Sequence, residues 1–277
     1  MDSPRAVVIT ATIGEPALAA AIASVQAQTY RPIRHVIVID GASYEQLARQ
    51  AIDMAAPSAV PVEVVVPETN TGKSDHYGHR IYATSDQLAS EDLVFFLDAD
   101  NVFDPEHVDI CAQAIMSTGA TWAYSLRRII DEDGSWFCPD DCDSLGFWPR
   151  YRTLHLGLSV LPPAEEEFLL AVPYLVDTSC YCLRREVVAR WSRCWEVGRG
   201  ADCVFATELI RHEVGVGTGQ RTVGYRLDVK AHPSTAEYFL KGNDLARQHY
   251  GSPLPWISRQ PGGTVAPPDE LVTRFGR

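Results

Sequence analysis

The chain has 277 residues, a hydrophobic share of 46% and a formal net charge of −12. This length can form one large domain or two small ones, and it is sufficient to bury a sizeable core. The acidic balance argues against nucleic-acid binding, because phosphate contacts need clustered Lys and Arg side chains.

Two further features of the composition narrow the class of protein. No apolar run approaches the roughly 20 residues needed to cross a bilayer, so no transmembrane segment is predicted. The seven cysteines are an odd number scattered along the chain, which favours reduced structural thiols over a disulfide framework or a zinc site. We therefore expect a cytoplasmic protein, and contact with a membrane surface remains compatible with the sequence.

The first hundred residues alternate strand and helix signals. Apolar segments rich in Val, Ile and Phe predict buried strands at Arg5–Thr12, His35–Asp40, Val62–Val66 and Leu93–Leu97. Between them, Ala17–Gln28 is helix-like behind Pro16, and Ser43 is expected to cap a further helix, with Gln46 as its capping-box partner. This alternation predicts an α/β fold with a mostly parallel sheet and helices on both faces.

The second half is less regular. Asp104 is expected to cap a helix that runs to about Ser117. Residues 131–163 are rich in Asp, Pro, Gly and aromatic residues and have little periodicity, which is typical of a functional or mobile segment. After them we expect a strand near Ser179–Leu183, helices at about Arg185–Trp195 and Asp202–Glu213, and a surface tail from Gly251.

The sharpest chemical signal is Asp98-Ala99-Asp100, directly after the predicted fourth strand. Ligands of parallel sheets bind at the carboxyl ends of the strands. Two carboxylates at such an end can hold a divalent cation against a diphosphate, and the cation would stabilise charge on a departing nucleoside diphosphate. The alternative is a pair of solvated loop acids.

Asp40 ends the second strand, so we expect it at the same edge of the sheet as Asp98 and Asp100. It is either a ligand of a nucleoside or part of the turn before the next helix. Because Ser43 is expected to supply the helix cap, Asp40 has no local task, which favours the functional interpretation.

Five short segments occur in an order that resembles family 2 of the nucleotide-sugar glycosyltransferases. They are Thr10–Thr12, Ser24–Tyr30, Val38–Gly41, Asn70–Gly72 and Phe96–Asp100. The resemblance is good over roughly residues 5–110 and loose beyond, and it implies the GT-A fold, a nucleotide-sugar donor with a UDP-sugar favoured, and Mn²⁺ or Mg²⁺.

The resemblance also implies roles for individual residues. Asp40 would recognise the nucleoside, Asp98 would lie near the ribose or sugar, and Asp100 would ligate the metal. Family members carry an acidic pair about a hundred residues later, whose Asp is the general base. Here that place holds Ala201-Asp202, so Asp202 is either the base or only a helix N-cap.

His232 falls where some GT-A enzymes place a histidine on the metal or diphosphate, although a lone His is more often structural. Lys73 or Arg80 would neutralise the diphosphate, and the sequence does not decide between them. The predicted donor- and cofactor-binding residues are thus Thr12, Glu15, Asp40, Asn70, Gly72, Lys73, Arg80, Asp98, Ala99 and Asp100, and the predicted metal ligands are Asp98, Asp100 and His232.

Aromatic residues gather in the irregular middle: Trp136, Phe137, Phe147, Trp148 and Tyr151. They either form a platform for an acceptor sugar or pack beneath a long loop. Gly215, Gly217 and Gly219 lack the spacing of a dinucleotide-binding loop and follow a predicted helix.

These observations predict a metal-dependent, inverting glycosyltransferase acting on a saccharide or lipid-linked acceptor. Residues 1–126 would bind the nucleotide sugar and residues 127–277 the acceptor, within one continuous domain. One alternative is a nucleotidyltransferase that makes nucleotide sugars, although Thr12–Glu15 contains no basic loop after the first strand. Another is a non-catalytic sugar-nucleotide-binding protein of the same fold.

Overall fold

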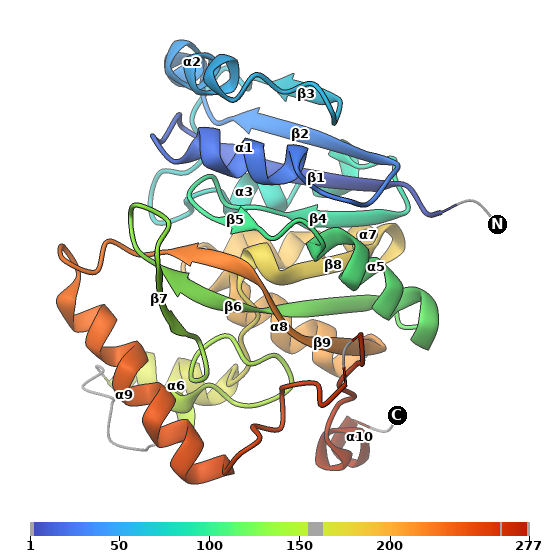
Figure 1. Ribbon diagram of the computed structural model, residues 1–277, viewed down its shortest axis with the longest axis vertical. Coiled ribbons are helices and arrows are strands. Elements are labelled where there is room, and N and C mark those ends of the chain that lie inside the picture. The colour runs from blue at the N-terminus through green and yellow to red at the C-terminus, as the bar shows by residue number, and fades with distance from the viewer. Residues whose placement is uncertain (1–2, 155–162, 261, 276–277) are drawn as a thin grey trace.

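The computed structural model describes residues 3–154, 163–260 and 262–275. A nine-stranded mixed sheet runs through both halves of the chain in the order β3-β2-β1-β4-β8-β6-β9-β5, with β7 paired to β6 (Figure 1). The strands are β1 (Ala6–Thr12), β2 (Ile33–Ile39), β3 (Val62–Val65), β4 (Leu93–Phe96), β5 (Val102–Phe103), β6 (Trp122–Ile130), β7 (Trp136–Pro139), β8 (Tyr181–Arg184) and β9 (Gly215–Arg226).

The helices cover both faces of this sheet. In Figure 1, α1 and α5 lie in front of it, and α3, α7 and α8 lie behind. The α-helices are α1 (Leu18–Gln26), α2 (Glu45–Ala55), α3 (His79–Tyr82), α4 (Ser85–Leu88), α5 (His107–Thr118), α6 (Pro163–Ala171), α7 (Arg185–Trp191), α8 (Ala201–His212), α9 (Pro233–Tyr250) and α10 (Asp269–Phe275). Short 3-10 turns are η1 (Ala42–Tyr44), η2 (Tyr151–Leu154), η3 (Thr178–Cys180) and η4 (Ser192–Val197).

The first half of the sheet is parallel, as the alternating elements predict. Strands β3, β2, β1 and β4 pair side by side in one direction. All seven residues of β1 are buried, since helices cover both faces of such a sheet. Their carboxyl ends meet at one edge, on the left in Figure 1.

The second half of the sheet is mixed, and several of its elements are not evident from periodicity. Strand β8 runs antiparallel between β4 and β6, and β9 pairs parallel with β6. Because β6 includes residues 122–130, the expected division at residue 126 falls inside one strand of a common sheet. Helix α9 was also not predicted.

Two helix caps predicted from the sequence are wrong. No side-chain hydrogen bond caps η1 or α2, and Ser43 lies within the 3-10 turn Ala42–Tyr44. Asp104 makes no cap for α5 and instead forms an ion pair with Arg128 at 2.5 Å. In both cases a tertiary or turn geometry replaces the local capping geometry that the residue types favour.

The stretch predicted to be irregular is partly ordered. It contains β7 and the first residue of α6, and residues 155–162 lie outside the described part of the chain. The predicted helix at 185–195 ends at Trp191 and continues as η4. No described helix is long and apolar enough to span a membrane.

Most of the middle aromatic residues are core residues. Phe147, Trp148 and Tyr151 are buried, and the ring of Phe147 packs edge-on against Tyr124. Trp136 alone of the five is largely exposed, at 59%. The packing alternative therefore describes the buried three, and a role as an acceptor platform stays a prediction.

Candidate active site

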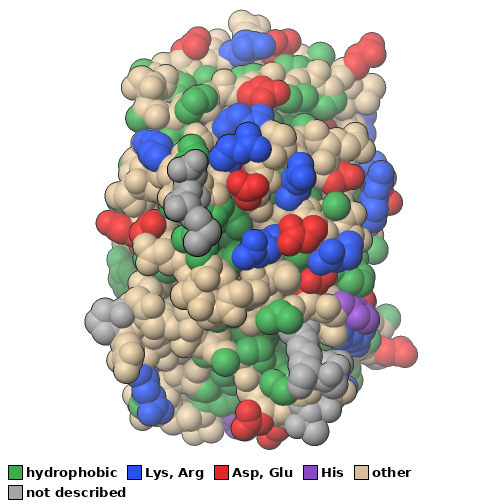
Figure 2. Space-filling model, turned by 90° about the vertical axis from the view of Figure 1, so that its right-hand side faces the viewer, with side chains coloured by type: hydrophobic (Ala, Val, Ile, Leu, Met, Phe, Trp, Pro, Cys, Tyr) green, Lys and Arg blue, Asp and Glu red, His purple; other side chains and the backbone are tan. Residues whose placement is uncertain are grey.

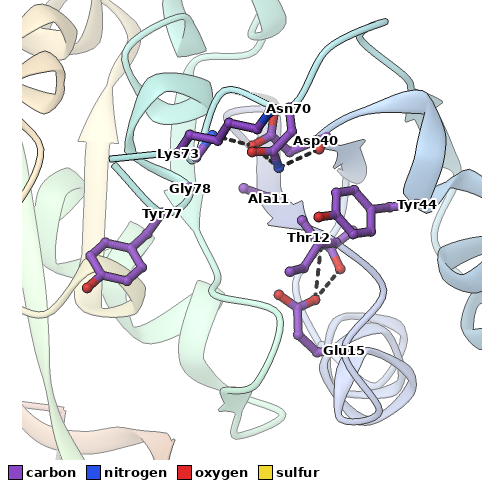
Figure 3. A pocket seen from close by; sticks show the side chains of 11 residues that line it. Ala11, Thr12, Glu15, Asp40, Tyr44, Asn70, Lys73, Tyr77 and Gly78 are labelled. Carbon is purple, nitrogen blue, oxygen red and sulfur yellow. Dashed lines mark hydrogen bonds between the residues drawn. The ribbon is translucent and has the colours of Figure 1, made fainter. Parts of the chain in front are cut away.

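A pocket of about 270 Å³ lies at the carboxyl ends of β1 and β2 (Figure 3). Asp40, Asn70 and Lys73 lie on one side, and Thr12, Glu15 and Tyr44 lie on the other. Its described lining is Ala11, Thr12, Ile13, Glu15, Asp40, Tyr44, Asn70, Gly72, Lys73, Tyr77 and Gly78. Six residues predicted to bind the donor thus come together here, and we call this cavity the first pocket.

Asp40 has a local task that the sequence did not reveal. Its Oδ1 accepts hydrogen bonds from the amide and hydroxyl of Thr71 at 2.8 and 2.9 Å. Its Oδ2 accepts from the amide of Gly72 at 2.9 Å and from the side chain of Asn70 at 3.2 Å. A carboxylate offers about four acceptor sites, so Asp40 holds segment 70–72 in place with all of them.

Gly72 is required where this segment turns towards the pocket. A Cβ at this position would lie 2.4 Å from the carbonyl oxygen of Tyr77 and 3.2 Å from Oδ2 of Asp40. The first separation is sterically impossible without a backbone shift. Of the two cations that could neutralise a diphosphate, Lys73 lines the pocket, whereas the guanidinium of Arg80 donates to the carbonyl of Thr71 at 3.0 Å.

Thr12 and Glu15 form the opposite wall of the first pocket. The hydroxyl of Thr12 donates to Oε2 of Glu15 at 2.5 Å and accepts from the amide of Gly14 at 2.9 Å. These contacts close the turn after β1. The sequence did not single out Tyr44 and Tyr77, which line the same pocket. Tyr77 is 64% exposed and has a left-handed φ of 48°, and its ring points away from Asp40 and Thr12 (Figure 3).

Asp98 and Asp100 follow β4 at the same edge of the sheet. Asp98 is half-buried, and its Oδ1 accepts a hydrogen bond from the hydroxyl of Tyr82 at 2.8 Å. Its backbone amide donates to Oγ of Ser179 at 3.1 Å. Ala99 between the two acids points into the core beneath α1 and α2. Tyr82 and Ser179 lie far from Asp98 in sequence, so only the fold identifies them as its supports.

The two acids sit in a negative field. Burial, together with the charges of Asp177 and Asp100, raises the pKa of Asp98 well above 3.8. Loss of hydration in the crevice, with the charges of Asp177 and Glu15, also raises the pKa of Asp100, although its side chain is exposed at the rim. These shifts mean that negative charge in the crevice is incompletely neutralised.

Such an arrangement fits a divalent cation. Hard cations take carboxylate oxygens as ligands, and Asp98 and Asp100 provide them where cationic side chains do not balance the charge. His232 does not join them here, since no three His, Cys, Asp or Glu side chains of the described residues gather as metal ligands. It lies exposed before α9, and its predicted role as a ligand stays a prediction.

Asp202 faces the same crevice from the first turn of α8. Its charge contributes to raising the pKa of both Asp98 and Asp177, which places its carboxylate within electrostatic reach of Asp98. Its Oδ1 also accepts from the amide of Cys203 at 2.8 Å. Asp202 is therefore not the helix N-cap, which is Gly200 without a side-chain cap, and its role as the general base stays a prediction.

A second pocket of about 440 Å³ opens beside Asp202. Its described lining is Arg150, Arg152, Ala164, Phe168, Arg199, Gly200, Asp202 and Cys203. No residue lines both pockets. Asp202 thus lines the cavity with the arginine-rich wall and not the cavity at the strand ends.

Asp177 was not predicted from the sequence, and it contacts both Arg127 and the turn that supports Asp98. It accepts from Arg127 at 2.5 Å and from the amide of Ser179 at 3.0 Å. Arg127 also pairs with Asp140 at 2.7 Å and Asp143 at 3.0 Å. This buried cluster anchors the loop after β7 and the turn that supports Asp98.

Solved structures of known proteins have a fold similar to that of this chain. Crystal structures of S. aureus TarS 1–349 superpose with TM-scores of 0.55 with UDP, 0.53 with UDP-GlcNAc and 0.56 without ligand, at 13, 13 and 11% sequence identity. The matches cover 81, 81 and 90% of this chain and 60, 58 and 72% of the TarS chains. The chain therefore spans about 60% of the UDP-bound TarS fragment, and at this identity the likeness concerns the GT-A fold.

No curated protein matches the sequence. The sequence pattern described as Glycosyl transferase family 2, however, matches residues 6–187, which include β1 to β8 and both acids after β4. The predicted family and α/β GT-A fold are thus confirmed, and the chain belongs to glycosyl transferase family 2.

Proposed function

We propose that this enzyme transfers a sugar from a nucleoside-diphosphate sugar, with UDP-sugars favoured, to a hydroxyl of a saccharide or lipid-linked acceptor. The observation that carries the proposal is that the charges of Asp100 and Asp202 both act on Asp98 at the carboxyl end of β4, while Asp202 also lines the second pocket. UDP and UDP-GlcNAc in the related TarS structures support the choice of donor.

In this proposal the nucleoside diphosphate occupies the first pocket. Segment 70–72, held by Asp40, forms one wall, and Lys73 lies where it can contact the diphosphate. Asp40 then acts on the nucleoside chiefly through the position of this segment, since four protein donors already face its oxygens. Tyr44 offers an aromatic face for the base.

Asp98 and Asp100 would hold Mn²⁺ or Mg²⁺, which when bound supplies positive charge to stabilise the leaving diphosphate. Asp202 accepts the proton of the acceptor hydroxyl while that oxygen forms a bond to the anomeric carbon. The bond from this carbon to the diphosphate oxygen breaks on the opposite face, and its electron pair leaves with the diphosphate. Attack and departure on opposite faces invert the anomeric configuration.

The proposal is tested by thermal shift with UDP, with and without Mn²⁺, on the wild type and Asp100→Ala. A ligand that binds the native state raises its apparent stability. We expect a metal-dependent shift in the wild type that Asp100→Ala loses. A wild type that no nucleoside diphosphate stabilises would contradict the assignment of the first pocket.

Assays of turnover then distinguish the proposed transferase from the nucleotidyltransferase and from the non-catalytic protein. Metal-dependent release of UDP from a UDP-sugar, lost in Asp202→Asn while UDP binding is retained, supports the transferase. Formation of a UDP-sugar from UTP and a sugar 1-phosphate would support the nucleotidyltransferase instead. Binding of UDP without any turnover would indicate the non-catalytic protein.

A further inference from the structure

The second pocket has a positively charged wall in an acidic protein. Three of its eight described lining residues are arginines, and Asp202 is the one acid among them. The chain as a whole carries a net charge of −12. On the face drawn in Figure 2, by contrast, Lys and Arg alternate with Asp and Glu. The arginines of the second pocket are thus a local feature that overall composition does not explain.

Arg150 is already neutralised. Its guanidinium donates to Oδ1 of Asp143 at 2.6 and 2.8 Å and to the sulfur of Cys203 at 3.1 Å. Asp143 is shared with Arg127 and also accepts from the hydroxyl of Tyr238 at 3.1 Å. Arg150 therefore shapes the pocket wall and has little capacity left for a ligand.

Arg152 forms no ion pair with a described residue, although its charge acts on Asp143, a carboxylate that already pairs with Arg127 and Arg150. Its guanidinium lies over the ring of Tyr238, 4.9 Å from the centroid. Its Nε is buried and has no hydrogen-bond partner among the described residues. A buried guanidinium donor without an acceptor is costly. An anionic ligand in this pocket would supply the missing acceptor.

The ring of Tyr238 holds Arg152 ready for such a ligand. Stacking on an aromatic face fixes the plane of a guanidinium but leaves its edge donors available. The hydroxyl of the same tyrosine is bound to Asp143, so the ring itself is fixed. Arg152 is thereby oriented before any ligand binds, which reduces the entropic cost of binding.

We propose that the acceptor substrate carries an anionic group, a phosphoryl or a carboxylate, which Arg152 binds while a hydroxyl of the same molecule reaches Asp202. This inference rests on the proposed function, because it assumes that the second pocket holds the acceptor. Guanidinium forks recognise both anions through paired hydrogen bonds. Arg199 lines the same wall, and the first turn of α8 adds the positive end of a helix.

The test compares matched sugars that differ only in charge. Binding of glucose, glucose 6-phosphate and glucuronate is measured by calorimetry in the presence of UDP and Mn²⁺. The proteins are the wild type, Arg152→Gln, Arg152→Lys and the control Arg193→Gln, whose side chain is 62% exposed and pairs with Glu196. The two anions distinguish a phosphoryl from a carboxylate preference.

We expect the wild type and Arg193→Gln to bind at least one anionic sugar about tenfold or more tighter than glucose. The preference should weaken with added salt and fall to within about threefold in Arg152→Gln. Arg152→Lys should retain part of it, because the charge remains while the fork is lost, and this variant serves if Arg152→Gln does not fold.

Three results would overturn the inference. One is an equal affinity of the wild type for neutral and anionic sugars, and another is a preference that survives Arg152→Gln. The third is a loss of UDP affinity in Arg152→Gln with the sugar preference intact, which would assign Arg152 to the donor diphosphate. UDP binding by the wild type is measured in the same samples, so its absence would instead identify a failure of the proposed function.

Discussion

Replacing Asp40 with Asn tests whether this side chain holds a protein segment or binds the nucleoside directly. The carboxylate accepts four hydrogen bonds from residues 70–72. In Asp40→Asn one oxygen becomes an NH₂ group, which in either orientation faces two donors. The remaining oxygen keeps its partners but loses its charge.

The expected loss in the free energy of unfolding follows from these contacts. Each buried donor left without an acceptor costs about 1–3 kcal/mol, and the donors here are only partly buried. We therefore expect the free energy of unfolding to fall by about 2–3 kcal/mol. Because segment 70–72 lines the first pocket, the affinity for UDP should fall in the same variant, roughly tenfold or more.

Urea unfolding and calorimetric titration with UDP and Mn²⁺ measure the two quantities. The matched control is Asp53→Asn, an exposed position on α2, which should change stability by less than about 0.5 kcal/mol. If Asp40→Asn is as stable as this control and still loses UDP affinity, the carboxylate binds the nucleotide and the anchoring argument is refuted.

Three further predictions follow from the buried charges. Arg127→Met leaves three carboxylates without their shared partner and should lower the free energy of unfolding in urea by about 3–5 kcal/mol, whereas Arg193→Gln should change it by less than about 0.5 kcal/mol. An equal effect of the two would contradict the role of the cluster. Tyr82→Phe removes the hydrogen bond to Asp98 and should raise the pKa of that carboxyl further, measurable by NMR titration; an unchanged pKa would exclude this support. Because the folded-state pKa values of Asp98 and Asp100 lie above 3.8, the native protein binds protons more tightly than the unfolded chain. Metal-free protein should therefore gain stability from these groups as the pH falls through the raised values towards 3.8, and the double Asn variant should lack this gain in pH-dependent urea midpoints.

Much of the N-terminal half is predictable because its information is local. Continuous apolar segments specify β1, β2 and β4, and the acids that follow them must emerge at one sheet edge whatever the rest of the chain does. This is why Asp98, Asp100 and the wall of the first pocket could be named from the sequence. Helix α8, which ends at His212, and the acid Asp202 in its first turn are local signals of the same kind.

The second half resists prediction because its strands do not show the usual alternation. Strand β9 contains Gly215 and Gly217, which lie against the rings of Trp122 and Tyr124 on β6; a Cβ would stand 2.3 and 2.9 Å from their nearest atoms. Glycine is therefore required at these two positions because β9 packs against β6, which lies far away in the sequence. Without knowledge of that pairing, the two glycines suggest a loop.

The sequence by itself determined the family, the sheet of the first half and the acids at the strand ends, because short periodic patterns and turn positions encode them. The tertiary structure alone decided what each side chain contacts. It occupies the oxygens of Asp40 with segment 70–72, supports Asp98 with Tyr82, and stacks Arg152 on Tyr238 with its Nε unbonded among the described residues, in the pocket that Asp202 also lines. Such partners are set by long-range packing, and no local pattern of residue types specifies which distant donor meets which acceptor.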